Sequence, residues 1–231
     1  MAPVAGVLGL YAGGSLATGD FRAGVSDFDL VAVIATPLDD GRQQRVQSLH
    51  RQLIAEKPLA AKLHCAYVPL PDVTDVAASH LNWAHGELYR RPLSAVARAE
   101  LQTGLTLLGP PPASLVPPVG AQTLAEGVRA ELSGYWRTAV RKPWLWRHDV
   151  YVDLGLLTLA RAEATLTEGR LITKAEALTR LARWGVRPGL VHEIERRRRG
   201  EPVALSPWRR LRRARHARQV VATGIRTLLG D

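Results

Sequence analysis

Two aspartates, Asp27 and Asp29, lie one residue apart at the start of a run of apolar residues that extends to Ile34. The run is typical of a buried strand, and a strand places alternate side chains on the same face. Two carboxylates on one face repel each other unless a cation lies between them. Magnesium meets this need, because it prefers oxygen ligands and usually keeps substrate phosphates as its other ligands. The pair therefore predicts a site for divalent cations, and two such ions can stabilise an in-line phosphoryl transfer.

A turn of small residues, Gly13-Gly14-Ser15, ends the preceding apolar run about a dozen residues earlier. Glycine lets backbone N–H groups approach a phosphate closely, and the Ser15 hydroxyl adds a donor. Ser26, directly before the first aspartate, can add another. The turn and the acidic pair together predict a phosphate cradle beside a metal site. The alternative is an acidic loop capped by turn residues.

The stretch from Gly13 to Ile34 resembles the signature of the polymerase-β-type nucleotidyltransferase superfamily. The resemblance implies a small mixed sheet flanked by helices. It also implies an enzyme that transfers a nucleoside monophosphate from a nucleoside triphosphate to an acceptor. It implies that Asp27 and Asp29 are catalytic and hold two Mg²⁺ ions. Residues that would bind the nucleotide phosphates in this stretch are Gly14, Ser15 and Ser26.

The order of periodic segments divides the chain into two parts. The first part combines expected strands at 7–10, 29–35 and 62–70 with expected helices at 41–56 and 94–103, which indicates an α/β or α+β unit. Five prolines between Gly109 and Gly120 predict a stiff connector, and the patterns beyond it are helical. We expect a nucleotidyltransferase domain over residues 1–110, a linker over 111–120 and an all-α helical bundle over 121–231.

The segment Asp153–Leu178 resembles the C-terminal helical domain of aminoglycoside 3''-adenylyltransferases. The match is a Leu-Thr-Leu-x-Arg helix, a Thr-x-Gly-basic turn, and a lysine that opens the next helix after a Thr173–Glu176 capping box. The resemblance implies that Arg161 and Lys174 bind ATP phosphates between the domains. An arginine in an apolar helix and a lysine at a helix N-terminus are both costly without an anion nearby. The alternatives are a structural ion pair for Arg161 and a solvated Lys174.

The sequence departs from this family at the third carboxylate, a glutamate that acts as general base on the acceptor hydroxyl. The glutamate should fall within residues 62–67 of the expected strand, but these contain no acid, and His64 is the residue that would align there. An imidazole can take a hydroxyl proton at neutral pH, although a half-buried structural histidine is an equal alternative. Glu87 is a second candidate for the base.

The acceptor site in this family uses a tryptophan and acidic residues just before the Leu-Thr-Leu helix. Four residues of these types precede that helix here: Trp144, Trp146, Asp149 and Asp153. They do not align individually with the residues of the family. Core packing is the alternative for the tryptophans. The same stretch also carries four cations: Arg137, Arg141, Lys142 and Arg147. This balance favours a less cationic acceptor, such as spectinomycin or another hydroxylated small molecule.

The formal net charge of +10 comes mainly from arginine, because the chain has only four lysines. A coding bias toward arginine and an anionic partner would each explain this. Much of the charge lies in Glu195–Arg218, which predicts either a solvated helical face or a surface for phosphates of ATP or nucleic acid.

The remaining composition indicates a cytoplasmic protein. Cys65 is the only cysteine, which excludes a disulfide framework and a cysteine metal cluster. No apolar run reaches the roughly 18 residues of a membrane helix, so no membrane partner is expected. Residues 1–15 are apolar without a lysine or arginine, so we interpret them as a core strand rather than a signal peptide.

Two hypotheses of different classes follow. The first is a Mg²⁺-dependent O-adenylyltransferase that moves AMP from ATP to a small acceptor, an aminoglycoside or aminocyclitol by resemblance. The second is a catalytically degenerate protein of the same fold that binds nucleotide or nucleic acid without transfer, as the missing glutamate suggests. Adenylylation of a protein or a tRNA end is a further alternative within the enzyme class.

Overall fold

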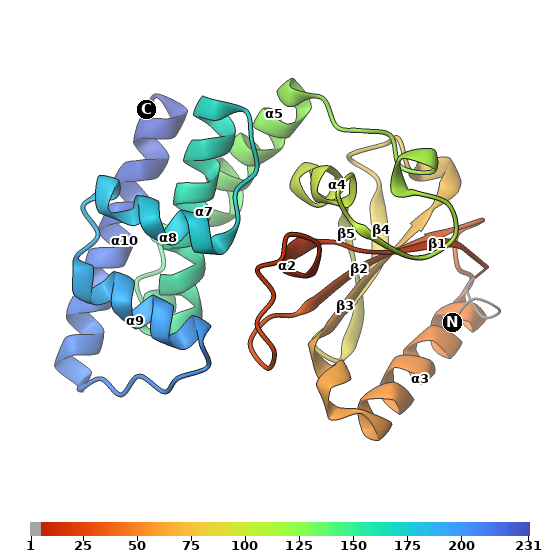
Figure 1. The fold of residues 1–231 in the computed structure, drawn as a ribbon, viewed down its shortest axis with the longest axis horizontal. Helices are drawn as coiled ribbons and strands as arrows, with labels where there is room; N and C mark the ends of the chain where they lie inside the picture. The colour runs from red at the N-terminus through yellow and green to blue at the C-terminus, as the bar shows by residue number, and fades with distance from the viewer. Residues whose placement is uncertain (1–5) are drawn as a thin grey trace. The chain divides into compact units, whose positions relative to one another are not determined.

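The computed structural model describes residues 6–231, which form two compact units that divide between Gly120 and Ala121. The first unit is built on a sheet and the second is helical (Figure 1). The core strand expected within residues 1–15 is present from Val7, and residues 1–5 lie outside the described residues.

The sheet of the first unit has six strands: β1 (Val7–Ala12), β2 (Phe28–Ile34), β3 (Leu63–Pro69), β4 (Ser79–Ala84), β5 (Glu87–Pro92) and β6 (Leu105–Leu108). Their order is β5-β4-β3-β2-β1-β6. The β2–β3 pair is parallel and the other pairs are antiparallel. A parallel pair needs a crossover, which contains helix α3 (Asp40–Glu56). The small mixed sheet flanked by helices that the sequence predicts is confirmed.

The two faces of the sheet bury different residues, because side chains alternate along each strand. On one face Ile34 packs in a cluster with Val46 of α3. On the other face Tyr11 packs in a cluster with Leu101 of α4 (Ala95–Leu101). Figure 1 shows α3 and α4 on opposite sides of the sheet. Val116, from the proline-rich segment, is fully buried in the second cluster, so this segment packs on the first unit instead of standing free.

His50 of α3 is a buried histidine, and burial in the folded protein favours its neutral form. Its Nε2 lies 2.7 Å from the Tyr67 hydroxyl oxygen, and its ring stacks on Trp83 at 4.6 Å. Burial lowers the pKa of His50 from 6.5 to about 4. As the pH falls below 6.5, the unfolded state therefore binds the proton first, and stability that is present above this pH is lost.

We expect the free energy of unfolding to fall between pH 6.5 and 4, with His50 contributing on the order of 2 kcal/mol. Urea unfolding of the wild type and of His50→Gln across this range measures the contribution. The glutamine keeps a hydrogen-bonding group but does not titrate, so its curve should be flatter. Equal pH dependence in the two proteins would contradict the assignment.

The second unit consists of six α-helices: α5 (Ala121–Glu131), α6 (Arg137–Val140), α7 (Asp149–Glu168), α8 (Lys174–Arg180), α9 (Pro188–Arg198) and α10 (Pro207–Leu229). One turn of π-helix, Leu132–Trp136, joins α5 to α6. Helix α7 packs against α5, α8 and α10 and ends at Gly169, which adopts a left-handed conformation with φ of 69°. Within residues 6–231, no helix has both the length and the apolar character needed to cross a membrane.

Helix α8 begins with the predicted capping box. The Thr173 hydroxyl oxygen accepts from the backbone N–H of Glu176 at 3.1 Å, and the Glu176 carboxylate accepts from the backbone N–H of Thr173 at 2.8 Å. The prediction from sequence is confirmed. Short helical turns complete the structure: α2 (Gly14–Ala17), Pro58–Lys62, Leu70–Asp72, Pro112–Ser114, Leu145–Arg147 and Leu181–Trp184.

Candidate active site

Strand register brings the candidate residues of the first unit to one edge of the sheet. Ala12, at the end of β1, lies opposite Leu30 near the start of the antiparallel β2. Asp29 lies opposite His64 near the start of the parallel β3. The two-residue turn between β4 and β5 lies at the same edge, because β3 and β4 are antiparallel. The Gly13-Gly14-Ser15 turn, the acidic pair and His64 therefore share one edge.

Asp29 is fitted against the glycine turn. Gly14 has φ of +57°, and a Cβ atom built on it would lie 2.5 Å from Asp29 Oδ2. Only glycine can adopt this conformation cheaply and leave room for the carboxylate. The Asp29 side chain stays 52% exposed and the Asp27 side chain 45% exposed. Both carboxylates are therefore open to a ligand from solvent.

Replacing Gly14 with alanine should disturb the site more than the fold. The left-handed conformation costs an L-residue roughly 1–2 kcal/mol, and the new methyl group must displace the Asp29 carboxylate. Gly19→Ala is the matched control, because Gly19 has φ of +72° with no atom within 4 Å of a built Cβ. We expect similar losses of unfolding free energy, with transfer activity reduced at least about tenfold more in Gly14→Ala. Equal activity in the two variants would contradict this arrangement.

The turn expected at Gly13-Gly14-Ser15 continues into a single turn of helix, α2. The backbone N–H of Gly13 is not free for a phosphate, because it donates to the Asp29 carbonyl oxygen at 2.8 Å. Ser15 lies in α2 and is half-buried. The Ser26 hydroxyl oxygen accepts from the Arg22 backbone N–H at 3.0 Å, so its own proton can still be donated.

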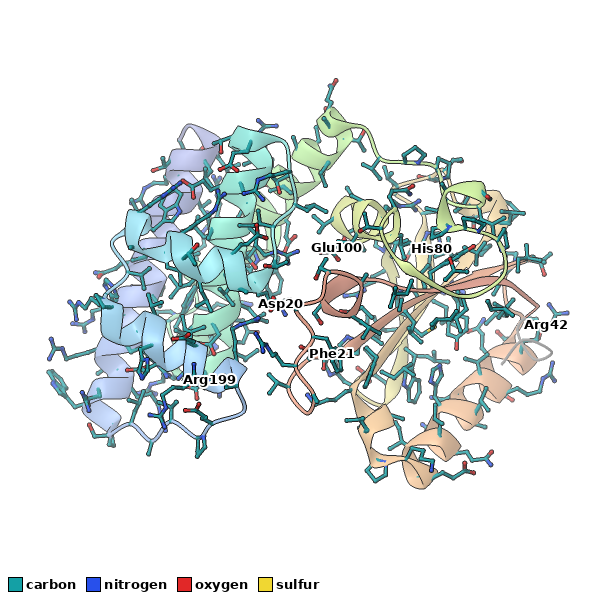
Figure 2. All side chains as sticks on the ribbon, viewed as in Figure 1. Asp20, Phe21, Arg42, His80, Glu100 and Arg199 are labelled. Atoms are coloured by element: carbon teal, nitrogen blue, oxygen red, sulfur yellow. The ribbon has the colours of Figure 1, made fainter. Side chains whose placement is uncertain are left out.

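The loop between α2 and β2 is anchored at both ends. The Asp20 backbone N–H donates to the Ser15 carbonyl oxygen at 3.0 Å. The rings of Phe21 and Phe28 lie 5.0 Å apart, and Figure 2 shows Asp20 and Phe21 on this loop. These contacts fix the chain that leads to Ser26 and the acidic pair.

Two basic side chains lie beside the two carboxylates. Lys62 Nζ is 3.8 Å from Asp27 Oδ1 and donates to the Val25 carbonyl oxygen at 2.9 Å. His64 Nδ1 is 3.5 Å from Asp29 Oδ1. These contacts place both carboxylates beside the basic residues at the start of β3, where Asp29 and His64 lie within the paired strands and Asp27 and Lys62 lie just before them.

The donor chemistry of the acidic pair fits Mg²⁺, which binds one or two carboxylates and takes its other ligands from water and substrate phosphates. The remaining ligands must come from outside the chain in this way, because residues 6–231 contain no group of three or more His, Cys, Asp or Glu side chains placed to hold a metal ion. The half-exposed carboxylates leave room for such ligands.

The candidate phosphate ligands of the second unit flank the turn between α7 and α8. Arg161 of α7 donates from Nε to the Ile172 carbonyl oxygen at 2.9 Å, which ties the helix to this turn. Lys174 is the first residue of α8 and is half-buried. The hydrogen bond gives Arg161 a structural role, and binding of phosphates by either residue stays a prediction.

The two candidate tryptophans have opposite environments. Trp146 is 0% exposed, and its indole N–H donates to the Ala139 carbonyl oxygen at 3.0 Å. This places Trp146 in the core of the second unit instead of on a surface that a ligand could contact. Trp144 is 59% exposed and is open to one.

The candidate acceptor carboxylates both pair with arginines. Arg197 donates to the two Asp153 carboxylate oxygens at 2.8 and 2.6 Å. Arg213 Nη2 lies 2.5 Å from Asp149 Oδ1. Burial raises the pKa of Asp153, and the Arg197 hydrogen bonds offset part of the rise. The pairing neutralises charge that a polycationic acceptor would need.

Comparison with known proteins identifies the fold. No protein-family model matches the sequence, and no curated protein matches it. Among solved structures, the chain is similar to spectinomycin adenyltransferase AAD(9) from Enterococcus faecialis, crystallised with ATP and spectinomycin. The TM-score is 0.66 at 13% identity, over 93% of this chain and 91% of that chain. The chain has the nucleotidyltransferase fold.

Two histidines lie at the start of β3, where the resemblance implies a third carboxylate. The His64 ring lies edge-on to the His85 ring, with centroids 4.8 Å apart. Among the described residues, His64 Nε2 is buried without a hydrogen-bond partner. His85 has φ of 55° in the turn before Glu87, which is exposed. Sequence reasoning missed His85 and Lys62. Gly86 was the available signal for the turn that carries His85, because glycine supplies the positive φ that tight turns require.

Proposed function

We propose that the protein is a Mg²⁺-dependent O-adenylyltransferase that moves AMP from ATP to a hydroxyl group of a small acceptor. The observation that carries this proposal is the half-exposed pair Asp27 and Asp29 at one edge of the sheet, with Asp29 packed against Gly14. The similar solved structure supports the same reaction class, because it is a spectinomycin adenyltransferase crystallised with ATP.

In this proposal Asp27 and Asp29 hold two Mg²⁺ ions. Bound Mg²⁺ would neutralise charge on the phosphates of ATP and on the departing pyrophosphate. The hydroxyl groups of Ser15 and Ser26 donate to the triphosphate, and Gly14 keeps the backbone clear of Asp29. In the second unit, Arg161 and Lys174 are the candidates for phosphate contact.

His64 is the proposed base for the acceptor hydroxyl. Its Nδ1 lies 3.5 Å from Asp29 Oδ1, which places the imidazole ring beside the acidic pair. Glu87, at the start of β5, is the alternative base. The hydroxyl oxygen attacks the α-phosphorus in line, and pyrophosphate leaves.

The proposed acceptor is an aminocyclitol such as spectinomycin, or another hydroxylated molecule of low positive charge. The pairing of Asp149 with Arg213 and of Asp153 with Arg197 supports this choice over a polycationic aminoglycoside. Exposed Trp144 is the remaining candidate for acceptor contact.

Incubation with labelled ATP, Mg²⁺ and a panel of aminoglycosides and aminocyclitols tests the proposal through acceptor-dependent pyrophosphate release. We expect release with the least cationic acceptors and none when Mg²⁺ is removed by chelation. A folded protein that binds ATP but releases no pyrophosphate with any acceptor would instead support the degenerate protein. The replacement of the expected glutamate by His64 is the observation that favours this second candidate.

A further inference from the structure

A cavity in the second unit combines arginines with an exposed indole ring. Its volume is about 520 Å³, and it is lined by Arg147, His148, Pro207, Trp208, Arg210 and Leu211. The lining comes from the turn before α7 and from the start of α10. It contains two guanidinium groups and one large aromatic ring, and no carboxylate.

The positive charge around this cavity is not balanced by acids. Residues 202–231 hold seven arginines and a single acid, Asp231, and so carry +6 of the net charge of +10. A coding bias toward arginine does not explain why acids are missing from this segment. Among residues 6–231 no carboxylate forms an ion pair with Arg147, Arg210 or Arg212, whereas buried Arg213 of the same helix pairs with Asp149.

Helix α10 carries Trp208 and two further arginines on its exposed face. Trp208 is 66% exposed, and Arg212 and Arg215, four and seven residues further along, fall on the same face of the helix. Both arginines are exposed, whereas Arg213, Ala214 and Ala217 are buried. The exposed face therefore extends the basic character of the cavity along the helix.

We propose that this α10 surface, formed by the cavity residues together with Arg212 and Arg215, binds single-stranded nucleic acid. An unpaired base would stack on the Trp208 ring, and Arg147, Arg210 and Arg212 would contact backbone phosphates. Proteins that bind single strands combine aromatic stacking platforms with a positively charged path for the backbone. A duplex keeps its bases stacked inside, so it can use the arginines but not the indole ring. The proposal for this surface does not depend on adenylyl transfer.

Fluorescence anisotropy with a labelled oligouridylate and the full-length protein tests this surface. We expect affinity to fall steeply as salt rises, because phosphate contacts release counterions. Trp208→Leu should weaken binding roughly tenfold or more, since one stacked base is lost, while Trp208→Phe should retain most of it. Trp208 is exposed, so neither variant should unfold the protein. A labelled duplex of the same length should bind more weakly than the single strand, and Trp208→Leu should not change the affinity for the duplex.

Two double variants that each remove two positive charges distinguish binding at the cavity from nonspecific electrostatic attraction to the whole protein. Arg147→Gln/Arg210→Gln removes two cavity charges, and Arg51→Gln/Arg183→Gln removes two exposed charges elsewhere. The cavity variant should lose at least about tenfold more affinity than the control. Equal losses in both, or no effect of Trp208→Leu, would overturn the proposal. So would competition by AMP at concentrations similar to the oligonucleotide, which would indicate a mononucleotide pocket. Asp29→Asn should bind the oligonucleotide normally, whether or not transfer is lost.

Discussion

Replacing Asp29 with asparagine is expected to reduce ATP-dependent transfer at least roughly a thousandfold while the protein stays folded. Asparagine keeps the shape of the side chain but loses the negative charge that attracts a divalent cation. Loss of several kcal/mol of charge stabilisation in the transition state corresponds to a change of this size. The fold should tolerate the change, because the side chain is 52% exposed and its partner His64 lies 3.5 Å away.

The measurement is pyrophosphate release at saturating ATP, with circular dichroism to check the fold. Asp40→Asn is the matched control, since Asp40 is an exposed acid in the first turn of α3. This control should keep wild-type turnover. Turnover by Asp29→Asn within a few fold of the wild type would exclude catalysis through the acidic pair.

Replacing Trp146 with alanine should lower the free energy of unfolding by about 3–5 kcal/mol, the usual cost of deleting a buried large aromatic side chain. The ring is fully buried and its N–H bonds to the Ala139 carbonyl oxygen. It also packs on Gly155 of α7 so closely that a Cβ on this glycine would lie 2.7 Å from the indole. The substitution therefore leaves a cavity beside Gly155 of α7.

Trp144→Ala is the control for this experiment, because Trp144 is two residues away and largely exposed. Its effect on urea unfolding should stay within about 0.5 kcal/mol. If Trp144 contacts the acceptor, this variant should raise the KM for the acceptor and leave stability unchanged. Comparable losses of unfolding free energy in the two variants would contradict the assignment of Trp146 to the core of the second unit.

Local patterns in the sequence predicted the elements that carry the site. Strand β2 follows from the apolar run after Asp29, and the start of α8 follows from the Thr173–Glu176 capping box. Such features depend on residues close together in the chain. The nucleotidyltransferase fold could be predicted for the same reason, because its signature is contained in one short stretch.

Features that depend on distant residues could not be predicted. Strand β4 is mostly buried without clear alternation, and β5 is mostly exposed, so periodicity gave no signal for the hairpin that places His85 beside His64. The pairing of Asp153 with Arg197 joins residues 44 positions apart. Residue type and the family resemblance made Asp153 a candidate ligand, whereas only the folded chain shows that Arg197 binds it.

Isothermal titration of ATP in the presence and absence of Mg²⁺ tests the central claim most directly, because it requires no knowledge of the acceptor. The wild-type protein should bind ATP at least about tenfold more tightly with Mg²⁺, a difference of roughly 1.4 kcal/mol. The double variant Asp27→Asn/Asp29→Asn should lose this dependence on the metal. An equal effect of Mg²⁺ on the two proteins would contradict the claim that these carboxylates bind the metal.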